Sequence, residues 1–107
     1  MSNVYDYILD NFKRDLSLNE VATIANLSSS AFCRYFKKFT RKTLSEFLID
    51  LRIGYACKLL QNNNMGISQI SLDAGFNNVS YFNRKFKVLK GETPMEYQRH
   101  FIVKKAN

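Results

Sequence analysis

Residues 67–97 read ISQISLDAGFNNVSYFNRKFKVLKGETPMEY and carry three helix signals in close succession. Apolar residues three and four positions apart predict a short helix from Ile67 to Gly75, a longer helix at about 79–90 and a last helix at about 94–101. The expected apolar stripe of the longer helix consists of Phe82, Phe86 and Leu89. Capping and turn-forming residues stand at the expected limits, namely Gly75, Asn78, Gly91, Thr93, Pro94 and Glu96.

The same pattern occurs earlier in the chain, where residues 18–47 read LNEVATIANLSSSAFCRYFKKFTRKTLSEF. A shift of 49 positions aligns the short helices and their turns, pairing Leu18 with Ile67, Val21 with Ile70, Ala25 with Ala74 and Leu27 with Phe76. A shift of 50 aligns the longer helices and the caps that follow, pairing Ser30 with Ser80, Phe32 with Phe82, Arg34 with Arg84, Phe36 with Phe86, Lys37 with Lys87, Thr43 with Thr93, Glu46 with Glu96 and Phe47 with Tyr97. The second copy has one extra residue in its turn, so the chain contains a repeated structural unit.

Helical spacing continues through the rest of the chain and predicts further helices at about 3–13, 18–25, 29–40 and 44–61. The expected inward faces are Val4, Ile8, Leu9 and Phe12; Leu18, Val21, Ala22 and Ala25; Phe32, Tyr35, Phe36 and Phe39; and Phe47, Leu48, Leu51, Tyr55, Leu59 and Leu60. No segment alternates with period two, so we expect an all-α fold of seven helices. The expected organisation is a single domain, 1–107, with lobe one at about 3–43, a connecting helix at about 44–61, lobe two at about 62–101 and a flexible tail at 102–107.

Length and charge narrow the possible partners. The 107 residues suit one domain, and 46% hydrophobic with 23% charged residues indicates a globular chain. The net charge is +7, and nine of the 16 basic residues fall in the windows 34–42 and 84–90, which contain no acidic residue. Two separate basic patches favour a polyanionic partner, and the alternative is two solvated helix faces.

The sequence lacks the residues that several classes of function require. Cys33 and Cys57 are too few for a disulfide scaffold or a four-ligand zinc site, and Cys57 is expected to pack as a small apolar group. The single histidine, His100, has no obvious cysteine or acidic partner. No apolar window is long enough to span a membrane, and the start MSNVYDYILD does not resemble a secretory signal. We therefore expect no enzyme activity, no cofactor or metal, no membrane contact and a reducing, cytoplasmic setting.

A short helix, a tight turn and a longer helix with an exposed basic face describe a helix-turn-helix, and the repeat supplies two of them. With the phenylalanine pairs facing the core, the outward faces are Ser30, Cys33, Arg34, Lys37 and Arg41 in the first copy and Val79, Ser80, Asn83, Arg84 and Lys87 in the second. Arginine can pair with guanine and asparagine with adenine in the major groove. Ordinary alternatives exist, since an exposed arginine needs no ligand and Ser29, Ser30 and Asn78 can cap helices.

These residues resemble the signature of the AraC/XylS family. The resemblance rests on Ile67-x-x-Ile70-x-x-x-Ala74-Gly75-Phe76, Tyr81-Phe82-x-Arg84-x-Phe86-Lys87 and Gly91-x-Thr93-Pro94-x-x-Tyr97. Leu51-Arg52-Ile53-x-x-Ala56-x-x-Leu59-Leu60 is similar to the connecting helix of the family. The resemblance covers about residues 4–99 and implies a seven-helix DNA-binding domain in which the third and sixth helices are recognition helices. It also implies a bacterial transcription regulator. Most members of the family are activators that also contact RNA polymerase.

The resemblance also assigns roles to individual residues. It implies base reading by Ser30, Cys33, Arg34, Val79, Ser80, Asn83 and Arg84. The expected phosphate contacts are Ser29, Lys37, Lys38, Arg41, Asn78, Lys87 and Lys90. Cys33 and Val79 are poor hydrogen-bonding groups, so we expect them to contact thymine methyl groups. The chain departs from the family pattern twice, with Arg41 where the second copy has Gly91 and with Ser71 where the family commonly has alanine.

The resulting hypothesis is sequence-specific binding of double-stranded DNA by a transcription regulator, with two recognition helices in successive major grooves and no small-molecule ligand in this domain. The alternative is a helical interaction module whose basic faces bind an acidic protein. A salt-dependent affinity for duplex DNA separates the two, because counterion release makes DNA binding fall steeply with salt. Non-specific binding of single strands would need surface aromatics as stacking platforms, whereas the phenylalanines here are expected on core faces.

Overall fold

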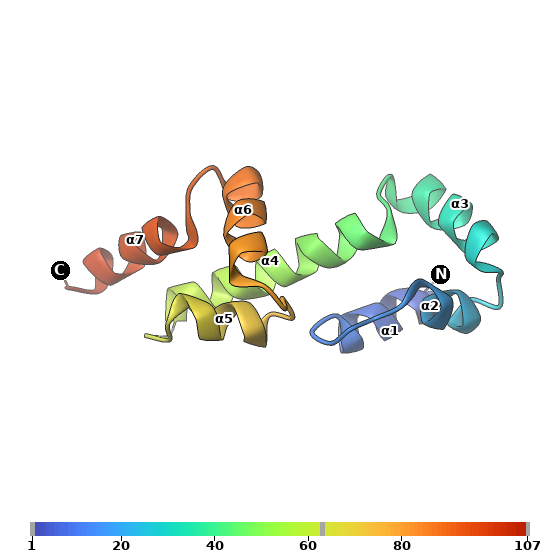
Figure 1. The fold of residues 1–107 in the computed structure, drawn as a ribbon, viewed down its shortest axis with the longest axis horizontal. Coiled ribbons are helices and arrows are strands. Elements are labelled where there is room, and N and C mark those ends of the chain that lie inside the picture. Colours follow the sequence, from blue (N-terminus) through green and yellow to red (C-terminus); the bar gives the residue numbers. More distant parts are fainter. Residues whose placement is uncertain (1, 63, 107) are drawn as a thin grey trace. The chain divides into compact units, whose positions relative to one another are not determined.

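The computed structural model describes residues 2–62 and 64–106, and these residues form helices joined by short turns, with no strand among them (Figure 1). The helices are α1 (Ser2–Asn11), α2 (Leu18–Ile24), α3 (Ser29–Thr40), α4 (Leu44–Asn62), α5 (Ile67–Asp73), α6 (Val79–Lys90) and α7 (Pro94–Ala106). The predicted all-α class and the predicted order of seven helices are confirmed for this part of the chain. α7 continues to Ala106, where the sequence predicted a flexible tail from residue 102.

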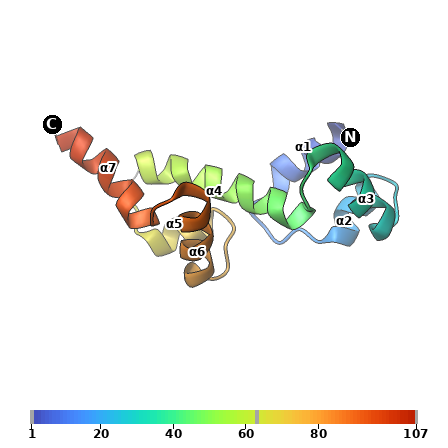
Figure 2. The same cartoon turned by 90° about the horizontal axis from the view of Figure 1, so that it is seen from above.

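The helices group into two compact units that divide between Leu51 and Arg52, within α4. Unit 1 contains α1, α2, α3 and the first part of α4, and unit 2 contains the rest of α4 with α5, α6 and α7. Figures 1 and 2 show α1, α2 and α3 beside the start of α4. The helix expected to connect two lobes therefore contributes residues to both units.

Aromatic contacts hold the core of unit 1 together. Its buried residues are Val4, Ile8, Val21, Ala22, Phe32, Phe36 and Leu48. The ring centroid of Phe36 lies 5.3 Å from that of Phe32 and 5.3 Å from that of Phe47. Because Phe47 belongs to α4, these contacts fix the buried face of α3 against the start of that helix.

Unit 2 repeats this arrangement. Its buried residues are Ile53, Ala56, Cys57, Leu60, Ile70, Ser71, Ala74, Phe76, Phe82, Phe86 and Pro94. The ring of Phe86 lies 5.7 Å from that of Phe82 and 5.4 Å from that of Tyr97, as Phe36 lies near Phe32 and Phe47. The packing therefore follows the repeat seen in the sequence. Cys57 is 7% exposed, which confirms its predicted place in the core.

Four residues that the apolar pattern placed inside are exposed. The exposed fractions are 52% for Leu9, 40% for Tyr35, 56% for Phe39 and 46% for Leu89. Phe39 and Leu89 are the penultimate residues of α3 and α6, so they lie one turn or nearly so beyond Phe36 and Phe86. Leu9 and Tyr35 lie about 100° around their helices from Ile8 and Phe36, on the flank of the buried stripe. The prediction from periodicity that these four residues are buried is therefore wrong.

Serine side chains cap the starts of α2 and α3. Ser28 Oγ accepts a hydrogen bond from the amide of Ala31 at 3.2 Å. Ser17 Oγ accepts one from the amide of Glu20 at 3.1 Å. The Glu20 carboxylate is engaged mainly by Arg14 and by the hydroxyl of Tyr7, and these hydrogen bonds lower its pKa to about 2. Glu20 thus joins α2 to the segment before it.

Ser71 is a buried polar residue, and among the described residues its hydroxyl has no hydrogen-bond partner. The first copy has Ala22 at the equivalent position, also buried. We expect Ser71→Ala to raise the free energy of unfolding by about 1–3 kcal/mol, because burying an unpaired polar group is unfavourable. Urea denaturation measures this change, and Ala22→Ser is the matched reverse, expected to lower stability. A loss of stability on Ser71→Ala would show that the hydroxyl has a partner.

Candidate nucleic-acid interface

α3 presents the first of the two expected faces. Phe32 and Phe36 are turned into the core of unit 1, and Ser30, Cys33, Arg34 and Lys37 are exposed on the other side. Ser28 is the N-cap, so the hydroxyls of Ser29 and Ser30 are not used to start the helix. Ser29 Oγ instead donates a hydrogen bond to the side-chain oxygen of Asn19 in α2. The first turn of α3 therefore exposes small polar side chains, followed by cations.

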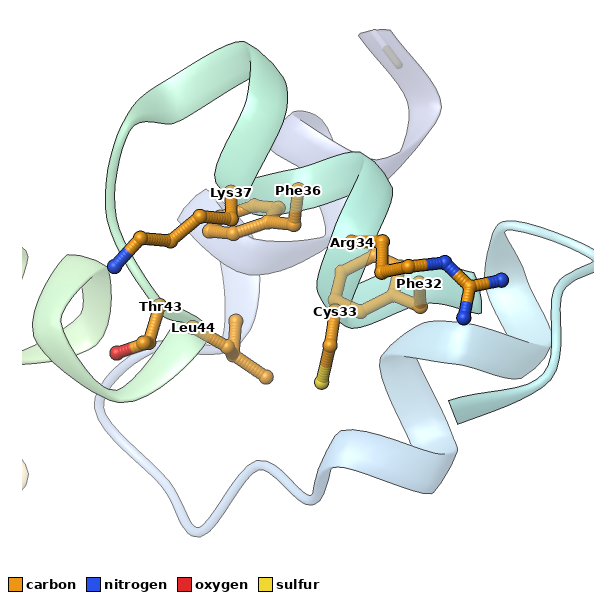
Figure 3. A pocket seen from close by; sticks show the side chains of 7 residues that line it. All are labelled: Phe32, Cys33, Arg34, Phe36, Lys37, Thr43 and Leu44. Atoms are coloured by element: carbon orange, nitrogen blue, oxygen red, sulfur yellow. The ribbon is translucent and has the colours of Figure 1, made fainter. Parts of the chain in front are cut away.

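A cavity of about 310 Å³ lies between this face of α3 and the start of α4. Its lining residues are Phe32, Cys33, Arg34, Phe36, Lys37, Thr43 and Leu44. Figure 3 shows the Cys33 sulfur pointing away from α3 toward this space, while the charged ends of Arg34 and Lys37 extend to either side. Beside Cys33 the surface is therefore apolar, which suits contact with a methyl group.

α6 presents the second face in unit 2. Phe82 and Phe86 are buried, Val79 is half-buried, and the other predicted contact residues of this helix are exposed, namely Ser80, Asn83, Arg84, Lys87 and Lys90. Asn78 is the N-cap, and its side-chain oxygen accepts a hydrogen bond from the amide of Tyr81 at 2.9 Å. The capping alternative for Asn78 is therefore confirmed. Arg34 and Arg84 occupy equivalent exposed positions two residues after a buried phenylalanine.

The ring of Tyr81 adds a feature to α6 that the sequence-based assignment of site residues missed. Tyr81 is 36% exposed, the guanidinium carbon of Arg84 lies 5.7 Å from its ring centroid, and the ammonium of Lys85 lies 5.6 Å from it. Both distances are within the range of cation–π interactions. The signal was present in the sequence, because Arg84 and Lys85 follow Tyr81 at the three- and four-residue spacing of helix neighbours.

The lysines that follow the arginines share an electrostatic setting. The helices after α3 and α6 begin with reciprocal capping boxes, in which the amides of Thr43 and Thr93 donate to Glu46 and Glu96 at 2.8 and 2.9 Å. Hydrogen bonds from these threonines lower the pKa of both glutamates, and the positive charges of Lys37 and Lys87 contribute further. Each lysine therefore lies near the start of the next helix, where backbone amides favour anions.

The segment after each basic helix turns through a left-handed residue. Arg41 has φ 65° and Gly91 has φ 79°, and their amides donate to the carbonyls of Lys37 and Lys87 at 2.8 Å. Left-handed backbone costs a non-glycine residue about 1–2 kcal/mol. An arginine at this position is therefore unfavourable for stability, and its exposed side chain is one of the expected phosphate contacts.

We expect Arg41→Gly to raise the free energy of unfolding by up to about 1 kcal/mol while weakening DNA binding. Relief of the left-handed strain exceeds the entropy cost of glycine, and the loss of one phosphate contact should reduce the salt slope by about one. Denaturation and binding at several salt concentrations measure the two effects. The control is Gly91→Ala, which should cost about 1 kcal/mol through conformation alone, because no atom lies within 4 Å of an added Cβ. Equal affinity of wild type and Arg41→Gly would remove Arg41 from the interface.

Other chemistry is sparse in the described parts of the chain. His100 Nε2 lies 2.8 Å from Glu92 Oε1, so this histidine has an acidic partner that its place in the sequence did not reveal. The pair is on the surface of unit 2, and no hydrogen bond found among the described residues joins it to a nucleophilic side chain. In residues 2–62 and 64–106, no cluster of three histidine, cysteine or acidic residues is arranged to hold a metal ion. No helix there is long and apolar enough to cross a membrane.

Comparison with known proteins points to one family. A family model described as a helix-turn-helix domain matches residues 21–100. An uncharacterised HTH-type transcriptional regulator of Bacillus subtilis, YdeC, is 32% identical over 99 residues, which are 92% of this chain and 34% of that protein. The first three curated relatives extend well beyond the matched region, since it makes up 34%, 60% and 32% of their lengths.

Solved structures agree with this match. A transcriptional regulator from Chromobacterium violaceum, described as AraC-type DNA-binding domain-containing, has a TM-score of 0.85 at 25% identity and covers 94% of this chain and 89% of its own. The DNA-binding domain of the global transcriptional factor AdpA, solved with a target DNA, has a TM-score of 0.91 at 20% identity and covers 99% of this chain and 96% of its own. The second similarity concerns the fold alone.

Proposed function

This chain belongs to the AraC-type helix-turn-helix family of transcription regulators, and we propose that α3 and α6 are its two recognition helices for double-stranded DNA. The observation that carries the proposal is the repetition of one exposed face. In both copies an arginine and a lysine project outward from a helix that buries a pair of phenylalanines four residues apart. The neighbouring basic residues add the charge that phosphate binding requires.

The first turns of the two helices are the proposed base-reading ends. Arg34 and Arg84 are placed to pair with guanine, and Asn83 to pair with adenine. Ser30 and Ser80 are small enough for close approach to base edges, and Cys33 and Val79 supply apolar contacts for thymine methyl groups. The cavity beside Cys33 supports its apolar role, because Phe32, Phe36 and Leu44 are among its lining residues.

Phosphate contacts are proposed for the remaining polar and basic residues of both copies. These are Ser29, Lys37, Lys38, Arg41, Asn78, Lys87 and Lys90. The lysines and Arg41 are exposed and carry the charge. The side-chain oxygen of Asn78 accepts from Tyr81, so its side-chain NH2 remains to donate to phosphate. The hydroxyl of Ser29 already donates its one proton to Asn19, so it would donate to phosphate only once that hydrogen bond is released.

Selection of bound sites from random duplex DNA tests this function. The expected product is an asymmetric bipartite motif, because the second copy has Asn83 where the first has Cys33 and Val79 where the first has Ser29. Its two halves should be centred about one helical turn, roughly 34 Å, apart if the helices enter successive major grooves. Absence of enrichment would overturn the proposal, and a footprint confined to one groove would overturn the two-groove arrangement. Binding to an acidic protein without affinity for duplex DNA would favour the interaction-module alternative.

For the whole protein we propose a cytoplasmic transcription activator that contacts RNA polymerase, with no catalytic role for this domain. The support is the family, whose named relatives include operon regulatory proteins of Pseudomonas aeruginosa and Escherichia coli. A reporter gene placed downstream of a selected site tests this. Increased transcription is the expected result, and decreased transcription would indicate a repressor.

A further inference from the structure

The two recognition helices differ beside their shared arginine. In α6, Tyr81 lies three residues before Arg84, and the guanidinium carbon of Arg84 lies 5.7 Å from the centroid of the Tyr81 ring. In α3, the residue three positions before Arg34 is Ala31, which has no ring. The arginine therefore occurs at the same position in both copies, whereas the position three residues before it is aromatic in the second copy and alanine in the first.

We propose that Tyr81 is a positioning residue that orients Arg84 for base reading, so that α6 discriminates among bases more sharply than α3. The inference rests on the proposed function of the two helices. It gives a role to a residue to which the family resemblance assigned no DNA contact, and it predicts an inequality between the two halves of the DNA site.

The ring of Tyr81 is itself held in place from the protein side. Its centroid lies 6.3 Å from that of Phe76, and Phe76 is 4% exposed and lies 5.0 Å from the buried ring of Phe82. A ring anchored to the core in this way presents a fixed surface to its cationic neighbours. Arg84 then has a partner whose position does not depend on DNA.

Orientation before binding favours affinity and specificity. A free arginine side chain loses considerable rotamer entropy when it forms a bidentate contact, and a side chain that already lies on a ring loses less. This gain in affinity appears only where the oriented guanidinium meets its matching base, because a mismatched base forms no paired hydrogen bonds to offset the loss of rotamer entropy. Lys85 lies over the same ring at 5.6 Å, and its compact ammonium has no planar fork for a base edge.

A double-mutant cycle tests the proposal. Binding of wild type, Tyr81→Leu, Arg84→Ala and the double variant is measured on the selected operator and on its single-base variants. An exposed cation–π contact corresponds to about a two- to five-fold change in affinity. We expect Tyr81→Leu to weaken binding to the preferred base by that factor, to leave binding to mismatched bases nearly unchanged, and to have no further effect once Arg84 is alanine.

Two control variants separate orientation from structure. Tyr81→Phe keeps the ring and should retain the wild-type preference profile, whereas Tyr81→Leu should lose it even if both variants unfold at the same denaturant concentration. Lys85→Gln removes the competing cation and should leave discrimination at the base read by Arg84 intact. The addition of a ring to the first copy by Ala31→Tyr should sharpen the preference of α3 by a similar factor.

The outcomes separate this inference from the function on which it rests. A wild-type protein without sequence preference refutes the proposed function. A wild-type preference that depends on Arg84, combined with equal effects of Tyr81→Leu in the presence and absence of Arg84, refutes the positioning role alone. A Tyr81→Phe variant as impaired as Tyr81→Leu also overturns it, because the hydroxyl and not the ring would then be responsible.

Discussion

Truncation of Phe36 or Phe86 to alanine should cost about 3–5 kcal/mol of unfolding free energy, the largest stability change that we expect for a single substitution in this chain. Phe36 is 1% exposed and Phe86 is fully buried. Each ring contacts the preceding phenylalanine of its own helix and the aromatic residue in the first turn of the next helix. Removal of either ring takes away apolar burial and leaves a cavity among aromatic neighbours that cannot collapse fully.

Phe39→Ala and Leu89→Ala are matched controls, because these residues lie on the same helices and are 56% and 46% exposed. They should cost less than about 1 kcal/mol, since most of their surface already contacts solvent. Chemical denaturation of all four variants measures the difference. If Phe86→Ala lost less than about 1 kcal/mol, or Leu89→Ala lost as much as Phe86→Ala, the assignment of buried and exposed faces of α6 would be wrong.

Most of the fold was predictable because its signals are local. The limits of α3 and α6 agree with their predicted ranges to the residue, and both are set by a side-chain cap at one end and a left-handed residue at the other. The repeat added a second, independent prediction of each limit. α1 and α5 each end two residues before their predicted ends. α7 differs most from its predicted range, because no strong helix breaker follows Phe101 and the pattern therefore contained no signal for its end.

Burial was less predictable than helix limits, because it depends on what packs against each helix. Phe39 and Leu89 are as apolar as their buried neighbours, and only the extent of the adjoining helices determines that they are exposed. Ile53 is 1% exposed although the apolar pattern did not assign it to the inward face of its helix. Its burial reflects packing within unit 2, which a pattern along one helix does not contain.

In the candidate site, too, some features were predictable from the sequence and others were not. Exposure of Arg34, Lys37, Arg84 and Lys87 was predictable, since these residues lie opposite buried phenylalanines on regular helices. The contacts among surface side chains were not. The pairing of His100 with Glu92 and the position of Arg84 on Tyr81 depend on side-chain conformations, which sequence spacing permits but does not select.

The roles of Arg84 and Lys87 should differ in a measurable way. Arg84 lies in the first half of α6 and Lys87 nearly one turn later, and both are exposed. If α6 enters the groove by its first turns, the arginine reaches base edges and the lysine reaches phosphate. Arg84→Ala should then cost about 1–3 kcal/mol of binding free energy and relax the preference at one or two base pairs. Lys87→Ala should weaken all sequences alike and reduce the salt slope by about one.

Binding of both variants to a panel of single-base operator variants at several salt concentrations separates these roles. Arg34→Ala and Lys37→Ala are the equivalent pair in α3 and should act on the other half of the site. Affinity alone is insufficient, because loss of a phosphate contact and loss of a base contact both weaken binding to the preferred sequence. The preference profile distinguishes them, since a phosphate contact is the same for every base pair. If Arg84→Ala lowers affinity uniformly and leaves the profile intact, Arg84 is a phosphate anchor. Specificity in that half of the site would then come from Ser80, from Asn83 or from the shape of the DNA.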